Sequence, residues 1–116
     1  MSREIAERQG RRGEGLAAWW LRLQGWRIVA SRVKTPRGEV DLIARRGRTV
    51  LFLEMKWRAT ATERDRAIDA YRLRRVAAAV EAIAHRYLRA GDNPRIDVLL
   101  LAPRCWPRHM VNAWQP

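Results

Sequence analysis

Three charged residues, Asp41, Glu54 and Lys56, interrupt two otherwise apolar segments of the sequence. Burying a carboxylate or an ammonium is expensive unless the group is paired or binds a metal. Two carboxylates on neighbouring strands could share one cation, and oxygen ligands suit Mg²⁺ or Mn²⁺ better than zinc. An ammonium two residues further on could orient an attacking water and offset charge developing on a phosphate. The alternative is an ion-pair cluster that only holds the strands in register.

The segments that carry these residues read as three successive β-strands. Residues 26–33, 39–44 and 49–56 are rich in β-branched and aromatic side chains, and short turns with Gly38 and Gly47 separate them. Short turns make neighbouring strands antiparallel, so we expect a meander.

Side chains on a strand alternate between its two faces. Glu39 therefore shares a face with Asp41, and Glu54 shares one with Lys56. If the second and third strands pair, Asp41 and Glu54 can converge near the middle of the sheet.

Helical periodicity appears before and after these strands. Apolar residues at helical spacing predict a first helix over 12–24 and a long second helix over 63–88, which could be broken near its start. Residues 95–102 form an apolar run typical of a strand buried on both faces. The expected order is α-β-β-β-α-β in a single nuclease-like domain, 1–116. We expect residues 1–11 to be flexible and the tail 103–116 to add an edge strand around 109–114.

The composition favours a polyanionic partner. The chain has 116 residues, 24 basic and 12 acidic, for a net charge of +12. Nucleic acid is the leading candidate partner, although a GC-rich genome could also favour arginine; Lys34 and Lys56 are the two lysines. A lysine at position 56 suits a site that needs a compact point charge. A single cysteine, Cys105, and the lack of a signal peptide or a long apolar run indicate a cytoplasmic protein.

Four motifs occur in order along the chain: residues 12–17, RGEGLA; 38–43, GEVDLI; 53–58, LEMKWR; and 95–98, RIDV. In this order they resemble the YraN-like family of uncharacterised bacterial proteins, for which endonuclease activity is suspected. The resemblance runs from about Gly10 to Leu101. It implies an α/β restriction-endonuclease-like fold, a central mixed sheet flanked by helices, similar to that of archaeal Holliday-junction resolvases.

The resemblance also implies roles for individual residues. Asp41, Glu54 and Lys56 would be catalytic, and Glu14 would join Asp41 and Glu54 as a ligand of Mg²⁺ or Mn²⁺. Glu14 could instead favour the dipole of the first helix. Glu39 is a candidate accessory ligand or a solvated strand end.

The candidate nucleic-acid contacts are basic residues near the proposed site: Arg45, Arg46, Arg58 and Arg72. Arg72 stands where the family usually has lysine, which favours phosphate binding over catalysis. Any of these arginines could equally be a solvated surface charge.

Together these features predict a magnesium-dependent endonuclease acting on DNA, with branched or junction DNA suggested by the family alone. Because resolvases cut two strands symmetrically, a homodimer is also expected. The main alternative is a nucleic-acid-binding protein of the same fold without turnover. A protein-interaction factor is a third option, supported only by the basic charge.

Overall fold

The protein is described here from a computed structural model that covers residues 3–65 and 70–114. The elements follow the predicted order, with a short helix between the third strand and the long helix. They are α1 (Arg3–Leu23), β1 (Arg27–Thr35), β2 (Gly38–Arg46), β3 (Thr49–Trp57), α2 (Ala61–Asp65), α3 (Ala70–Tyr87), β4 (Asn93–Leu101) and β5 (Arg108–Met110).

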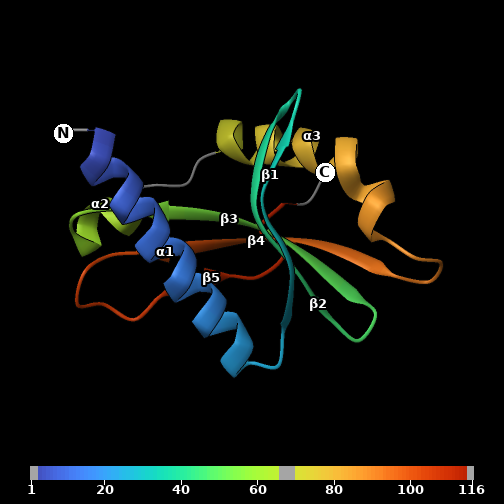
Figure 1. The fold of residues 1–116 in the computed structure, drawn as a ribbon, viewed down its shortest axis with the longest axis horizontal. Helices are drawn as coiled ribbons and strands as arrows, with labels where there is room; N and C mark the ends of the chain where they lie inside the picture. The colour runs from blue at the N-terminus through green and yellow to red at the C-terminus, as the bar shows by residue number, and fades with distance from the viewer. Residues whose placement is uncertain (1–2, 66–69, 115–116) are drawn as a thin grey trace.

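The five strands form one mixed sheet in the order β1-β2-β3-β4-β5 (Figure 1). The first three strands are an antiparallel meander, as predicted. β3 and β4 run parallel because a helical crossover joins them, and β5 returns antiparallel to β4. Parallel pairing usually requires both faces of a sheet to be covered, and here helices lie on both sides.

The two faces of the sheet have separate hydrophobic cores. On one face Ala17 and Leu21 of α1 pack against Leu42 and Leu53. On the other face α3 packs on a second cluster that includes Phe52. Consecutive residues Phe52 and Leu53 are both fully buried yet belong to different cores, as the alternation of a strand requires.

The sequence misplaced some element boundaries. α1 begins at Arg3 and not at residue 12, where the sequence predicted its start. The reason is propensity: residues 3–9 are mostly good helix formers and contain neither glycine nor proline. The expected flexibility of residues 1–11 stays a prediction. The predicted 63–88 helix corresponds to α2 and α3, and residues 66–69 between them lie outside the described residues. The predicted edge strand exists, but it is shorter and covers Arg108–Met110.

A polar network fixes the end of the chain to the sheet. Asp97, on β4, is fully buried and accepts hydrogen bonds from the guanidinium of Arg95 at 2.9 Å and from the backbone N–H of Asn112. His109 Nε2 lies 2.6 Å from Asp97 Oδ2, and the indole N–H of Trp20 donates to His109 Nδ1. Because an indole can only donate, Nδ1 accepts and the imidazole proton sits on Nε2, facing Asp97.

The charge on Asp97 is stabilised by this network. Burial opposes ionisation, but the hydrogen bonds from His109 and Arg95 outweigh it and hold the pKa of Asp97 below its ordinary value. β5 is therefore tied to the sheet by the hydrogen bond between His109 and Asp97 as well as by three backbone pairs.

Within residues 3–65 and 70–114, neither long helix has the length and hydropathy that crossing a bilayer requires.

Replacing the buried carboxylate should be costly. We expect Asp97→Ala to lower the free energy of unfolding by about 2–3 kcal/mol at pH 7, because Arg95 and His109 lose their shared partner. Since the pKa of Asp97 is lowered by folding, this contribution is present above the unfolded pKa and lost as the pH falls through the folded one. The loss should therefore shrink below pH ~4. Urea denaturation at pH 7 and pH 3.5 measures both effects.

The matched control is Glu81→Ala, which removes an exposed carboxylate 3.5 Å from Arg37. Such surface pairs contribute less than about 1 kcal/mol. Equal losses in the two variants would show that the Asp97 network adds nothing specific.

Candidate active site

Asp41 lies where the backbone pairing between β2 and β3 stops. The last paired residues at this end are Leu42 and Leu53, and the next residue on each strand is Asp41 and Glu54. Asp41 Oδ2 accepts the backbone N–H of Met55 at 2.7 Å. The carboxylate thus replaces a backbone carbonyl as the partner of β3 and bridges the two strands at the end of their ladder.

Glu54 and Lys56 share the face of β3 opposite to that of Leu53. Lys56 Nζ lies 2.7 Å from Glu54 Oε1, and the two side chains are 21% and 10% exposed. On β4 their neighbours are Val98 and Leu100, two fully buried residues. Apolar neighbours exclude water from one side of the pair, which strengthens its electrostatics.

The carboxyl groups of Asp41 and Glu54 influence each other directly. Burial and the nearby charge of Glu54 raise the pKa of Asp41 to about 7, although the Met55 N–H and Lys56 act in the opposite direction. A hydrogen bond between the two side chains contributes to this rise. The predicted convergence of Asp41, Glu54 and Lys56 is therefore present.

The charges in this cluster do not balance. Two carboxylates face one ammonium, since Lys56 is held by Glu54. An ion-pair cluster that served only to hold strands in register would be more stable with matched charges. A proton on Asp41 can restore the balance, and so can a cation held between the two carboxylates.

Glu14 is engaged elsewhere. Its Oε2 accepts a hydrogen bond from Arg32 Nε at 2.7 Å, at the edge of an open groove between α1 and β1. Arg32 has a positive φ of 50°, an uncommon conformation for a residue with a side chain. Among the residues that the structure describes, no three acidic, histidine or cysteine side chains are grouped as a metal site would require. The role of Glu14 as a third ligand remains a prediction.

Glu39 is exposed, and its cross-strand neighbour is Lys34 on β1. Opposite charges across an antiparallel pair are mildly favourable, so this pairing accounts for Glu39 without a metal. Its accessory role also remains a prediction.

The four predicted nucleic-acid contacts differ in their surroundings. Arg45 is bound by both oxygens of Asp92, at 2.6 and 3.1 Å, and also donates to the Tyr87 carbonyl. Arg46 lies 4.3 Å from the ring centre of Trp26. The half-buried Arg58 donates to the carbonyl of its neighbour Trp57, and the side chain of Arg72 lies outside the described residues.

Sequence reasoning missed Arg32, which determines where the carboxylate of Glu14 lies. No sequence pattern marks this residue, because its backbone conformation depends on the pairing of β1 with β2. It also missed the contact of Asp41 with the Met55 N–H, although an acidic residue inside an apolar strand was the right indication that something unusual happens there.

A protein-family model matches most of the chain. The model of the uncharacterised protein family UPF0102 matches residues 13–101, a range that contains Glu14, Asp41, Glu54 and Lys56. The match confirms the resemblance drawn from the four motifs.

Individual relatives extend the match to the chain ends. The chain is 65% identical over 116 residues to a UPF0102 protein of Erythrobacter litoralis, with both proteins covered over 100% of their length. It is 64% identical over 116 residues to a UPF0102 protein of Sphingopyxis alaskensis, again covering 100% of both. A UPF0102 protein of Parvibaculum lavamentivorans is 44% identical over 112 residues, which cover 96% of this chain and 84% of that one.

The raised pKa of Asp41 predicts a stability effect of opposite sign to that of Asp97. The folded protein holds a proton on Asp41 up to pH about 7, whereas the ordinary value is 3.8. Stability therefore falls as the pH rises between these values. Without metal ions, we expect Asp41→Asn to be more stable than wild type at pH 8 by up to about 4 kcal/mol and equally stable near pH 4. Denaturation in EDTA at both pH values tests this, and a variant less stable at pH 8 would contradict it.

Proposed function

This chain belongs to the uncharacterised protein family UPF0102, and we propose that it is a metal-dependent endonuclease that hydrolyses phosphodiester bonds in DNA. The single observation that carries the proposal is the unbalanced cluster of Asp41, Glu54 and Lys56 at the end of the β2–β3 ladder. Pairs of carboxylates whose charges are left uncompensated in a partly buried site are more typical of functional sites than of structural ones.

The donor set fits a hard divalent cation. Asp41 and Glu54 offer carboxylate oxygens from adjacent strands, which suit Mg²⁺ or Mn²⁺. When bound, the ion would act as a Lewis acid toward a phosphate oxygen. Burial and, after it, the nearby charge of Glu54 raise the pKa of Asp41. A cation between the two carboxylates would relieve their repulsion, which supports its uptake.

Lys56 would contribute the positive charge that the protein itself supplies to the reaction, in addition to that of the metal ion. The side chain of Lys56 is 21% exposed, which leaves it accessible to an incoming phosphate while Glu54 fixes its position. A fixed positive charge beside the scissile group favours the transition state, in which negative charge grows on the phosphate oxygens. The backbone N–H of Met55 holds the carboxyl group of Asp41 in place. This hydrogen bond persists when Asp41 loses its proton, because the carboxylate oxygen is still an acceptor.

The proposed substrate class follows from charge. A net charge of +12 attracts nucleic acid regardless of sequence, through phosphate contacts that release counterions. DNA with branches or junctions is the substrate suggested by the resemblance to resolvases.

One observation favours a second candidate, a nucleic-acid-binding protein without turnover. The 2.7 Å contact of Lys56 with Glu54 is what a purely structural ion pair would also show. The two candidates differ in one property, since only the endonuclease needs a divalent cation to act.

Cleavage assays separate these candidates. We expect wild-type protein with Mg²⁺ or Mn²⁺ to nick or cut branched DNA, and EDTA to abolish the reaction. Asp41→Asn, Glu54→Gln and Lys56→Ala should each reduce the rate by at least about 100-fold while DNA binding persists, because each removes a group that acts on the transition state. Gel electrophoresis of labelled branched, flapped and linear DNA measures the products.

The control is Glu81→Gln, an exposed carboxylate on the surface of α3 that pairs weakly with Arg37. It should cleave at the wild-type rate. If wild type and variants all bind DNA without metal and yield no cleavage product, the endonuclease is rejected and the nucleic-acid-binding protein is supported.

Homodimer formation is part of the proposal, because two copies are needed to cut two strands symmetrically. In support, Leu16, Trp19 and Leu23 follow one another along α1 and are 41%, 48% and 65% exposed. We expect Trp19→Glu to shift a dimer toward monomer by more than tenfold in dissociation constant, measured by analytical ultracentrifugation. Val111→Glu, which makes the same charge change at an exposed apolar position outside α1, should leave the equilibrium unchanged.

A further inference from the structure

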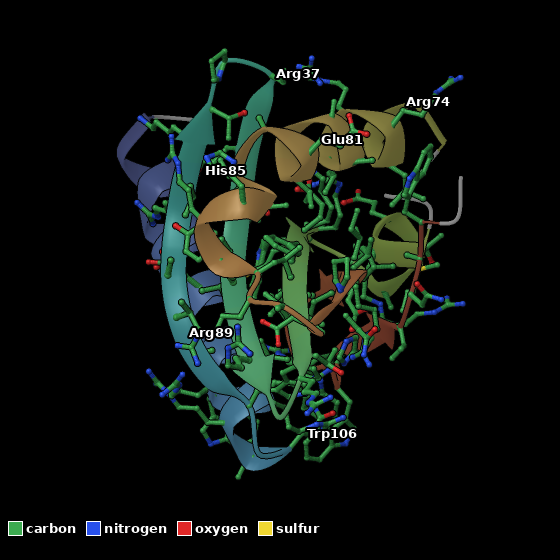
Figure 2. All side chains as sticks on the ribbon, turned by 90° about the vertical axis from the view of Figure 1, so that its right-hand side faces the viewer. Arg37, Arg74, Glu81, His85, Arg89 and Trp106 are labelled. Atoms are coloured by element: carbon green, nitrogen blue, oxygen red, sulfur yellow. The ribbon has the colours of Figure 1, made fainter. Side chains whose placement is uncertain are left out.

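Four arginines surround a small pocket at the opposite end of β2 from Asp41. The pocket has a volume of about 150 Å³, and Arg27, Arg45, Arg86 and Arg89 are among its lining residues. They come from the start of β1, the end of β2, the last turn of α3 and the segment after it. In Figure 2, Arg89 lies beyond His85, at the far end of α3 from Arg37 and Arg74. We call this site the arginine pocket.

The arrangement is unfavourable without an anion. Arg27 and Arg45 are direct cross-strand partners on β1 and β2. Like charges placed opposite each other in an antiparallel pair destabilise the sheet. A folded chain that keeps four guanidinium groups together needs negative charge to offset them.

Asp92 provides part of that negative charge, but both of its oxygens are already hydrogen-bonded. Its two oxygens accept both guanidinium hydrogen bonds of Arg45, at 3.1 and 2.6 Å, and Oδ2 also accepts the backbone N–H of Arg89 at 2.7 Å. These hydrogen bonds to Arg45 and Arg89 lower the pKa of Asp92 to about 2, so it stays ionised. The pair fixes Arg45 as one wall of the pocket.

The other three arginines remain available. Within the described part of the chain, no carboxylate forms an ion pair with the guanidinium of Arg27, Arg86 or Arg89, and all three residues are exposed. Positive side chains near the C-terminal end of α3 are partly explained by the helix dipole. That explanation covers Arg86 and Arg89 but not Arg27, which belongs to β1.

We infer that the arginine pocket binds a backbone phosphate of the nucleic acid, as an anchoring point separate from the proposed catalytic centre. Guanidinium groups pair with phosphate oxygens through two parallel hydrogen bonds. Three arginines besides Arg45 line this pocket, and of these only Arg89 has its charge acting on Asp92. The inference deepens the proposed function and rests on it for the identity of the polymer.

The distance between the two sites suits one extended ligand. Arg45 lies four residues beyond Asp41 on β2, and a strand rises about 3.3 Å per residue, so their Cα atoms are roughly 13 Å apart. At a rise of 3.4 Å per nucleotide this is about four nucleotides of one DNA strand. A ligand with one phosphate beside Asp41 could therefore place a second phosphate at the arginine pocket, and a single nucleotide could not.

Binding in EDTA tests this inference without requiring cleavage. The probe is a fluorescein-labelled 20-base-pair DNA duplex, followed by anisotropy as sodium chloride is varied. We expect the double variant Arg27→Gln/Arg89→Gln to bind at least tenfold more weakly than wild type at low salt. The slope of log K against log salt should fall by about 0.9, the equivalent of one lost phosphate contact. Arg45 is left intact because its pairing with Asp92 is structural.

The matched control removes the same charge elsewhere. Arg37→Gln/Arg104→Gln changes two exposed arginines outside the pocket. Equal loss of affinity in both double variants would overturn the inference, because the effect would then be one of net charge alone. Each variant should have the same midpoint temperature of thermal unfolding as wild type, which would establish that folded proteins are being compared.

A second measurement distinguishes the polymer from free phosphate. Calorimetric titration of wild type with inorganic phosphate should give weak binding that disappears in Arg27→Gln/Arg89→Gln. If inorganic phosphate binds in this way while the duplex binds both proteins equally, the pocket serves a small anion and the inference is wrong. DNA binding that depends on the pocket, without metal-dependent cleavage, would support the inference and reject the proposed endonuclease.

Discussion

The hydrogen bond from the Met55 N–H to the carboxylate of Asp41 is the contact on which the candidate site depends. It occurs one residue past the last backbone pair between β2 and β3, so a side chain continues the connection that the backbone gives up. This places a carboxylate between two strands, next to Glu54, in a position that solvent reaches only in part. The raised pKa of Asp41 follows from that placement, through burial and the nearby charge of Glu54.

The rest of the fold keeps this arrangement in position. α1 and α3 bury opposite faces of the sheet, and the residues on either side of Glu54 on β3 alternate strictly between the two cores. A shift of register by one residue would exchange the faces and bury Glu54 and Lys56 under α1. The apolar residues of β3 therefore determine the direction of the polar ones, and the stability of the cores opposes any slippage at the site.

Most of the architecture was readable from local sequence, and most of the missing parts depend on contacts between distant residues. Alternation placed Glu54 beside Lys56, and the short turn at Gly47 made β2 and β3 neighbours, so the approach of Asp41 to Glu54 could be predicted. The pairing of Glu14 with Arg32 could not, because it depends on a left-handed residue inside β1. Arg45 and Asp92 are 47 residues apart, and no periodicity connects them. The early start of α1 was missed because polar residues without an apolar stripe can still form a helix.

The short strand β5 has a consequence for the behaviour of the whole chain. β4 is an apolar strand of nine residues, and its outer edge is paired to only three residues of β5. Beyond them, the Asn112 and Ala113 N–H groups donate to Asp97 and to the Ile96 carbonyl and continue the cover. A chain cleaved after Pro103 would expose this edge as a ready template for strands of other molecules. Residues 108–113 thus cover an edge that would otherwise be open to strand pairing with other molecules.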